Sequence, residues 1–158
     1  MEQKAFQDFY PDQLSHCYGC GRLNDKGMQI KSYWDGDESV CEYTPKPYHT
    51  AFPGCVYGGL IASLIDCHGT GTASAAAYRA EGRAMDTSPP LRFVTGSLHV
   101  EFLRPTPIAG PLVVRSRIKE IKGRKVVVTS ELHAGGQMCV QGEVVAIQIP
   151  EDQLSCLL

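Results

Sequence analysis

Residues 54–69 read Gly-Cys-Val-Tyr-Gly-Gly-Leu-Ile-Ala-Ser-Leu-Ile-Asp-Cys-His-Gly, and this stretch predicts a turn that runs into a helix. Apolar residues recur in it at the spacing of one helical face. They are Leu60, Ile61, Leu64 and Ile65. Gly58 and Gly59 stand where the helix is expected to begin. The stretch decides the fold because the one long helix of the chain starts here.

Small side chains continue along this helix as far as Ala77. They are Gly58, Gly59, Ala62, Ser63, Gly69, Gly71, Ala73, Ser74, Ala75, Ala76 and Ala77. A glycine inside a helix costs up to about 1 kcal/mol relative to alanine, so the inner glycines need a packing reason. Small residues on several faces predict a helix that is enclosed on most of its circumference, which a curved sheet wrapped around it would achieve.

The start of the helix also predicts a binding site. The first helical turn leaves backbone N–H groups without partners, and the helix dipole favours negative charge there. Gly58 and Gly59 leave that end bare, so a ligand oxygen can approach the amides closely. Asp66 is the one carboxylate in this apolar helix, and burying an ionised carboxylate is costly unless a partner holds it. We therefore interpret both features as functional, rather than as an ordinary amphipathic helix with a stray acid.

The composition is that of one soluble globular domain over residues 1–158. With 43% hydrophobic and 20% charged residues it is ordinary for this class. A formal net charge of −2 argues against a general nucleic-acid or membrane-surface binder, which would carry a basic excess. We expect no secretory signal and no membrane span. The 7 scattered cysteines then indicate a cytoplasmic protein with reduced thiols.

Cys17 and Cys20 form a Cys-x-x-Cys pair, which is a metal or redox signal when further ligands accompany it. A tetrahedral zinc site needs four ligands, and Cys41 and Cys55 fall in different predicted elements. A redox pair of this kind belongs near a βαβ pattern, which the sequence does not contain. We therefore predict a tight glycine turn with two packed thiols, and no metal site.

The segments on either side of the helix are predicted to be strands. Two short strands, 28–34 and 39–44, precede it and flank the turn at Asp35-Gly36-Asp37. The four strands after it are 93–103, 112–121, 125–133 and 138–149. Tight turns between long neighbouring strands indicate an antiparallel meander. The fold class is therefore α+β, with one helix against one antiparallel sheet.

Three segments lie outside these elements. Residues 1–16 are expected to form an arm or short helix on the body, and residues 150–158 a tail. The proline-rich loop 45–57 carries His49 shortly before the bare helix start. A histidine in a loop is often only packed or exposed, but this position makes His49 a candidate site residue.

Three motifs make the chain similar to the hotdog-fold acyl-CoA thioesterases, in particular the phenylacetyl-CoA and 4-hydroxybenzoyl-CoA thioesterase group. The motifs are Cys17-Tyr18-Gly19-Cys20-Gly21 with Asn24 and Gly27, then Pro53 to Gly59 followed by Asp66, then 95–105 ending in Phe102-Leu103-Arg104-Pro105. The second resembles the family's Gly-x-x-His-Gly-Gly segment with an acid seven residues later. The resemblance covers about residues 17–149, and it is more specific for the superfamily than for the substrate.

The resemblance implies a hotdog fold, in which a curved antiparallel sheet wraps a long central helix. It implies a homodimer or a homotetramer (a dimer of dimers) with active sites at the subunit interface. The implied substrate is an acyl- or aroyl-CoA, with no cofactor beyond that coenzyme A. Helical rise agrees with a shared site: Asp66 lies roughly 10–12 Å along the helix from the amides of Gly58 and Gly59, too far for one thioester carbonyl to contact both. A second copy related by a two-fold axis could supply its Asp66 instead.

The resemblance also implies roles for single residues. The amides of Gly58 and Gly59 would form an oxyanion hole. Asp66 of the partner chain would be the general base or the nucleophile. Thr95 matches a Ser/Thr position of the family and would orient the water or the carboxylate. His49 falls in the loop that contributes a polar side chain to the carbonyl in some members.

Further residues are expected to contact the substrate. They are Tyr57, Leu60, Arg104, Arg124 and Lys125. The three basic residues are candidates for the CoA phosphates, although Arg124 and Lys125 fit solvated strand ends equally well. Tyr57 departs from the family's His, and Ala51 stands where the family often has Asn. A tyrosine can still donate one hydrogen bond.

Three other functions compete with hydrolysis. A non-catalytic hotdog module that binds acyl-CoA fits the change at Tyr57, whereas the retained Asp66 favours hydrolysis. A hotdog enoyl-CoA hydratase would carry an Asp-x-x-x-x-His motif, which is not found near Gly58. A zinc or redox protein centred on Cys17 and Cys20 would contain a stoichiometric metal.

Overall fold

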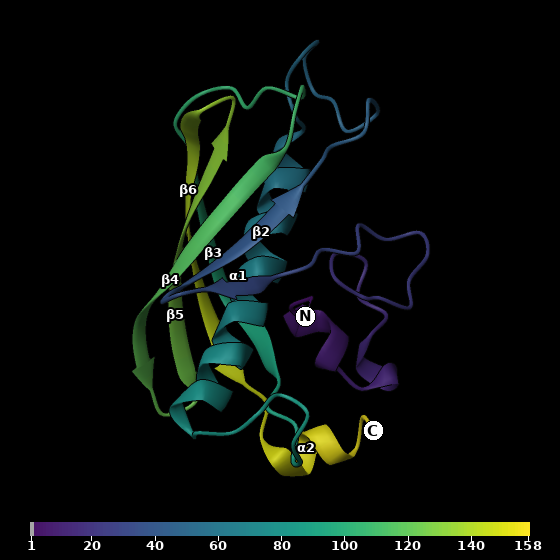
Figure 1. Cartoon of the computed structure of the whole chain (residues 1–158), viewed down its shortest axis with the longest axis vertical. Helices are drawn as coiled ribbons and strands as arrows, with labels where there is room; N and C mark the ends of the chain where they lie inside the picture. The colour runs from purple at the N-terminus through teal and green to yellow at the C-terminus, as the bar shows by residue number, and fades with distance from the viewer. Residues whose placement is uncertain (1) are drawn as a thin grey trace.

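The computed structural model describes residues 2–158 and contains one six-stranded antiparallel sheet with one long helix against it (Figure 1). The strands are β1 (Tyr33–Asp35), β2 (Glu38–Tyr43), β3 (Phe93–Phe102), β4 (Leu112–Lys122), β5 (Lys125–Ala134) and β6 (Gln137–Gln148). They lie in the order β1-β2-β4-β5-β6-β3, so β3 forms one edge. The helices are α1 (Gly58–Ala80) and α2 (Glu151–Ser155), with 3₁₀ turns η1 (Phe6–Phe9) and η2 (Asp12–Leu14).

The α+β architecture expected from the sequence is confirmed, with one error before the helix. The first strand begins at Tyr33 instead of Met28. The amides of Met28 and Ile30 donate to the carbonyls of Tyr18 and Gly19 at 2.8 and 3.0 Å. Residues 28–32 therefore pair with the Cys-x-x-Cys turn rather than with β2. A left-handed backbone at residue 29, where φ is 53°, also interrupts an extended strand.

The two ends of the chain fold onto the body. The expected arm contains η1 and η2, and its first residue, Met1, lies outside the described residues. The tail after Pro150 forms α2, which buries Leu154. Within residues 2–158 no helix is both long enough and apolar enough to cross a bilayer.

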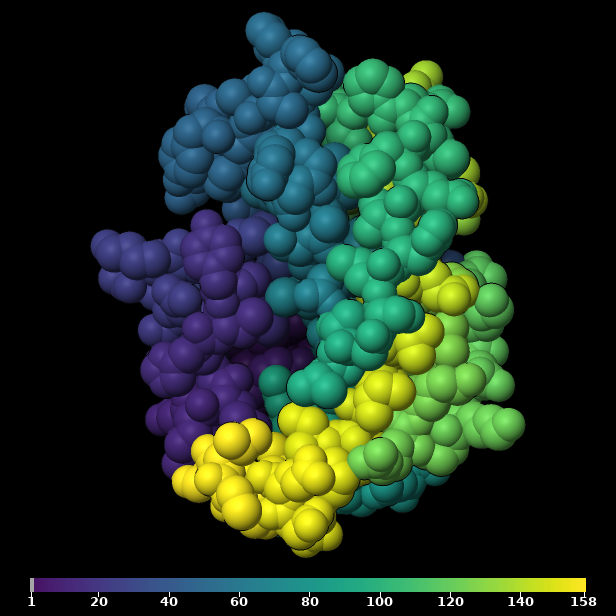
Figure 2. Space-filling view, turned by 180° about the vertical axis from the view of Figure 1, so that it is seen from behind, coloured from purple at the N-terminus to yellow at the C-terminus, as the bar shows by residue number. Residues whose placement is uncertain are grey.

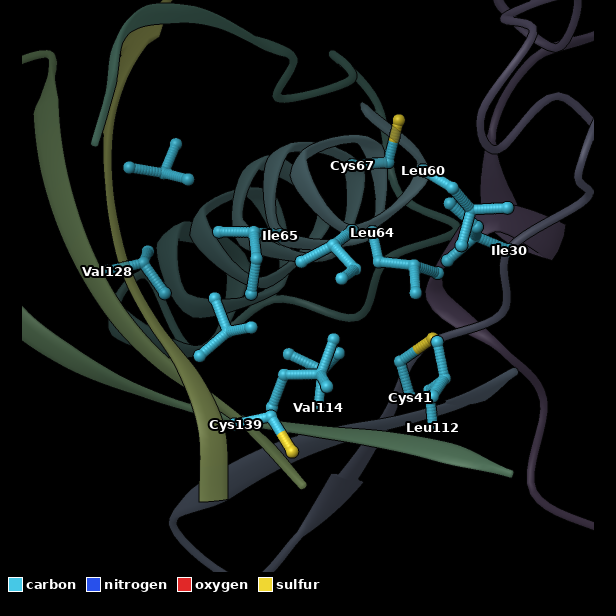
Figure 3. Close-up of a cluster of buried hydrophobic side chains, with 14 of the residues drawn as sticks. Ile30, Cys41, Leu60, Leu64, Ile65, Cys67, Leu112, Val114, Val128 and Cys139 are labelled. Carbon is cyan, nitrogen blue, oxygen red and sulfur yellow. The ribbon is translucent and has the colours of Figure 1, made fainter. Parts of the chain in front are cut away.

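α1 is enclosed from two sides, as its small residues predicted. It contacts β2 to β6 on one side, and the N-terminal segment covers the other (Figure 1). Leu64 and Ile65 are fully buried against the sheet (Figure 3). A Cβ at Gly69 would lie 2.7 Å from Val144 Cγ2 on β6, so the missing side chain permits the close approach. Gly71 permits a close approach on the opposite side of the helix, where the N-terminal segment lies, because a Cβ there would be 3.0 Å from Gln7 Nε2.

A buried polar chain joins the N-terminal segment, α1 and β2 around His68. Gln7 Nε2 donates to Ser32 Oγ at 3.0 Å, and Ser32 Oγ lies 2.8 Å from His68 Nδ1. His68 Nε2 lies 3.1 Å from Ser39 Oγ, which lies 2.6 Å from Thr72 Oγ1. Thr72 in turn donates to the His68 carbonyl at 2.7 Å. These contacts form one continuous donor-to-acceptor chain when His68 is neutral and protonated at Nε2.

Gly69→Ala should destabilise the fold even though alanine is the better helix former. The new methyl group meets the buried, stiff Val144 side chain, and overpacking of this kind costs about 1–3 kcal/mol. Urea unfolding of Gly69→Ala, Val144→Ala and the double variant checks this. We expect the double variant to lose less unfolding free energy than the two single variants lose together, by about 0.5 kcal/mol or more. Strict additivity would show that these two residues do not set the helix-to-sheet distance.

The stability of the fold should fall as pH drops from about 6.5 to 4. Burial lowers the pKa of His68 from 6.5 to about 4, because the charged ring is desolvated. In this range the unfolded chain binds a proton that the folded chain excludes, so stability rises with pH and is complete above 6.5. The loss across the range is on the order of 3 kcal/mol.

Unfolding by urea between pH 4 and 7.5 measures this slope. His68→Gln should flatten it, whereas His16→Gln, at an exposed position, should leave it unchanged. An equal slope in His68→Gln and the parent chain would assign the effect to another group.

Candidate active site

Asp66 lies on the side of α1 that faces β3, and Thr95 of β3 donates a hydrogen bond to Asp66 Oδ1. The strand register shifts between Thr95 and Ser97, so Gly96 forms a bulge beside the pair. A bulge re-aims the neighbouring side chain. Asp66 is half-buried and Thr95 is exposed, so solvent reaches the carboxylate from the β3 edge. The cost of burying this carboxylate, which the sequence analysis raised, is therefore only partial in the single chain, and Thr95 is the partner that holds it.

The amides at the start of α1 are available for a ligand, as predicted. No side chain caps the helix, and Tyr57 O accepts from Leu60 N at 3.1 Å and from Ile61 N at 3.3 Å. Among residues 2–158, the amides of Gly58 and Gly59 have no acceptor. The Tyr57 ring lies directly over Gly59, because a Cβ there would be 2.4 Å from the ring carbon Cε1. This end of α1 thus has free donors beside an exposed phenol.

His49 reaches the start of α1 through its backbone, because its carbonyl accepts from Tyr57 N at 2.9 Å. Its imidazole stands between Tyr43 and Tyr48, with ring centroids 6.0 and 4.7 Å away. Nδ1 accepts from Lys46 N at 3.0 Å. Burial, together with the Lys46 charge, lowers the pKa of His49. A neutral ring whose Nδ1 accepts carries its proton on Nε2, so this nitrogen is a donor.

The two halves of the predicted site lie far apart within one chain. Eight residues of helix, about 12 Å, separate Gly58 from Asp66. The residues of β3 that contact Asp66 and Gly58 also lie at opposite ends of that strand. Thr95 touches Asp66 near the start of the strand, whereas the Phe102 ring at its end would lie 3.5 Å from a Cβ at Gly58. One chain therefore holds the base and the free amides at opposite ends of β3.

The predicted substrate-binding residues are similarly dispersed. Arg104 follows β3 at the Gly58 end, where its Nη1 donates to Gln137 Oε1 at 3.2 Å. Arg124 lies in the β4–β5 turn, and Lys125 begins β5, where it pairs with Ile147 at the opposite end of β6. Leu60 is buried in the apolar core (Figure 3). The structure brings Arg104 near the helix start and leaves the β4–β5 turn away from it.

The hollows of the single chain lie elsewhere. A groove of about 600 Å³ on the sheet is lined by charged residues that include Glu38, Arg115 and Glu143. A second, of about 560 Å³, lies between η1 and the end of α1. Neither contains a predicted site residue. Asp66 and the helix start are therefore surface features of one chain and are not enclosed by it.

Two features escaped the sequence analysis. Gly96 inside a strand pattern is a signal for a bulge, and it went unused. Phe102 was noted only as part of a motif, and nothing in the sequence shows that its ring packs against Gly58.

A family profile matches the chain over the region just described. Residues 53–141 match the family described as the Thioesterase superfamily. Acyl-coenzyme A thioesterase THEM4 of Xenopus laevis is 28% identical over 110 residues, which are 70% of this chain and 44% of that protein. The Rattus norvegicus protein of the same name is 28% identical over 128 residues, 80% of this chain and 50% of that one. The chain spans about half the length of the curated relatives it matches.

Solved structures share the fold. A thioesterase superfamily protein from Shewanella loihica PV-4 is 48% identical, with a TM-score of 0.68 over 89% of this chain and 100% of that chain. The PaaI protein of the E. coli phenylacetic acid degradation operon is 15% identical, with a TM-score of 0.62 over 78% of this chain and 81% of that one. At that identity the second comparison shows the fold alone.

Proposed function

Because the chain belongs to the thioesterase superfamily and has its hotdog fold, we propose that it hydrolyses an acyl- or aroyl-CoA thioester to the free acid and CoA. The observation that carries this proposal is the hydrogen bond from Thr95 to Asp66, which lies at the solvent-accessible β3 edge of the sheet. A carboxylate held in this way is a ready general base or nucleophile. The reaction needs no cofactor besides the coenzyme A of the substrate.

The proposed chemistry divides between the two ends of α1. The thioester oxygen accepts hydrogen bonds from the amides of Gly58 and Gly59, where the helix dipole stabilises developing negative charge. His49 Nε2 is a further donor for the same carbonyl. As a general base, Asp66 removes a proton from the attacking water; the carbon–sulfur bond then breaks, and the departing thiolate takes up that proton. As a nucleophile, Asp66 attacks the carbonyl and expels the thiolate, forming a mixed anhydride. Water then hydrolyses the anhydride to the free acid and the Asp66 carboxylate, and the proton released goes to the thiolate.

A second copy of the chain is proposed to complete the site, and β3 supports this. β3 is an edge strand that lies on the face seen in Figure 2, and within residues 2–158 its outer hydrogen-bonding side is unpaired. Its side chains Val94, Leu98 and Phe102 are exposed. Unpaired apolar edges of this length invite pairing. When two β3 strands pair antiparallel, the Thr95 end of one lies beside the Phe102 end of the other. Asp66 of one chain then approaches the free amides at Gly58 of its partner.

The substrate contacts follow from the same arrangement. Arg104 lies at the Gly58 end of β3 and is the proposed partner of a CoA phosphate. Tyr57 and its exposed neighbours Tyr48 and Phe52 offer aromatic surface beside the free amides. The acyl group would enter between the two chains, because neither of the two hollows described above includes Asp66.

The second candidate function is a non-catalytic module that binds acyl-CoA. The Tyr57 ring over Gly59 favours it, because a bulky phenol crowds the place where the thioester oxygen would sit. Hydrolysis remains the better-supported function because binding alone gives no reason for the Thr95–Asp66 hydrogen bond.

Asp66→Asn should abolish thiol release from an acyl-CoA panel that runs from short to long and from aliphatic to aromatic. The amide cannot accept the water proton, while size and shape are retained. Thr95→Val removes only the hydrogen bond to the carboxylate and should lower kcat about 10-fold. Exposed Asp152→Asn is the matched control and should behave as the parent chain. Turnover by Asp66→Asn at the rate of the parent chain would remove Asp66 from the mechanism. Acyl-CoA binding by the parent chain without any turnover would favour the non-catalytic acyl-CoA-binding module.

Mixing two inactive variants tests the shared site. Gly59→Val crowds the free amides, so a chain carrying it and a chain carrying Asp66→Asn form one intact site in each mixed dimer. Random exchange should restore about a quarter of the parent activity, since half of the dimers are mixed and each has one working site of two. No recovery after chain exchange has been verified by mass spectrometry would place the whole site within one chain.

A further inference from the structure

Three cysteine sulfurs meet on the side of α1 that faces the N-terminal segment. Cys17 and Cys20 come from the turn before β1, and Cys67 comes from α1. All three Sγ atoms lie within 4.8 Å of one another, and Cys17 Sγ is 3.9 Å from Cys67 Sγ. The Cys67 sulfur points away from the apolar cluster that holds Leu64 and Ile65 (Figure 3). Cys67 belongs to the edge of this buried cluster, while its sulfur is aimed at the turn.

The backbone of this turn is built to let the three sulfurs converge. A Cβ at Gly19 would lie 2.3 Å from Cys67 Sγ, so only glycine admits that sulfur. A Cβ at Gly21 would lie 2.5 Å from Cys17 N. The turn is closed by hydrogen bonds from Gly21 N to Cys17 O at 2.8 Å and from Ile30 N to Gly19 O at 3.0 Å. The loop and the helix therefore hold the sulfurs together without a disulfide.

We infer that Cys17, Cys20 and Cys67 form a binding site for one thiophilic metal ion, with zinc as the fitting ion. Zinc–sulfur bonds of about 2.3 Å in a tetrahedral site place sulfurs about 3.8 Å apart. The 3.9 Å between Cys17 and Cys67 matches this spacing. The remaining pairs, at no more than 4.8 Å, need only small side-chain rotations. The sequence argued against a metal because it showed two ligands, and the fold supplies the third from α1.

The surroundings fit a charged metal–thiolate centre with one open position. Cys17 is exposed, so water can take the fourth place in the tetrahedron. Three thiolates and Zn²⁺ leave one negative charge. The exposed side of the cluster at Cys17 leaves this charge open to solvent.

Such an ion would link the N-terminal segment to α1 next to the proposed base, since Cys67 follows Asp66 directly. The two side chains leave the helix in different directions, Asp66 towards β3 and Cys67 towards the turn. The ion would therefore hold the helix and would not touch the thioester. This site is independent of the proposed hydrolysis, and its test does not use activity.

The decisive experiment measures metal binding by the full chain after reduction under anaerobic conditions. Zn²⁺ should bind at one equivalent per chain by elemental analysis after dialysis. Co²⁺ should give one equivalent of thiolate-to-metal charge-transfer absorption, which reports sulfur ligands directly. Zinc at about 100 times its Kd should raise Tm by roughly 5–10 °C.

Matched variants separate this site from the other cysteines. Cys17→Ser and Cys67→Ala should lose the cobalt absorption and the zinc-dependent rise in Tm. Cys156→Ser is the exposed control for the first, and Cys41→Ala is the buried control for the second. Both control variants should still bind one equivalent of metal per chain. Because Cys17 is exposed, its serine variant should fold even if Cys67→Ala does not.

Two results would overturn the inference. One is the absence of cobalt–thiolate absorption and of stoichiometric zinc in the reduced parent chain, which would leave three packed thiols. The other is undiminished binding in Cys17→Ser, which would move the metal elsewhere.

Discussion

The close approach of α1 to the sheet is the constraint on which the rest of the structure depends. Gly69 lets the helix backbone come so near β6 that a methyl group would collide with Val144. At that distance the sheet can contact the helix with five strands, from β2 to β6. The helix is then held firmly enough to present Asp66 to β3 on one face and Cys67 to the N-terminal turn on another.

The same geometry keeps the two halves of the proposed site apart within a single chain. A straight helix holds its first amides and Asp66 about 12 Å apart, and β3 runs beside it with matching contacts at both ends. No movement of one side chain closes that gap. The proposed antiparallel self-pairing of β3 would reverse the ends and bring the two halves of the proposed site together twice.

The N-terminal segment is attached to α1 by polar chemistry rather than by apolar packing alone. The His68 chain connects it to β2 through serine hydroxyls, and the three-cysteine cluster contacts it one helical residue earlier. The His68 chain is fully buried, so its polar groups require complete partnering, whereas the cysteine cluster opens to solvent at Cys17. Acid weakens the first by protonating the histidine of the unfolded chain, and the proposed metal would strengthen the second.

The sequence by itself determined the helix, the strands after it and the α+β class, because periodicity and glycine placement are local signals. It also placed Gly58 and Gly59 at the start of the helix and Asp66 within it. It erred at residues 28–32, where pairing with a distant turn overrides strand propensity. The family resemblance implied that Thr95 would orient the carboxylate or the water, whereas only the tertiary structure decided that Phe102 meets Gly58 and that Cys67 meets the Cys-x-x-Cys turn. Contacts between residues 30 to 50 positions apart depend on how elements pack, and local patterns in a single sequence carry no record of that packing.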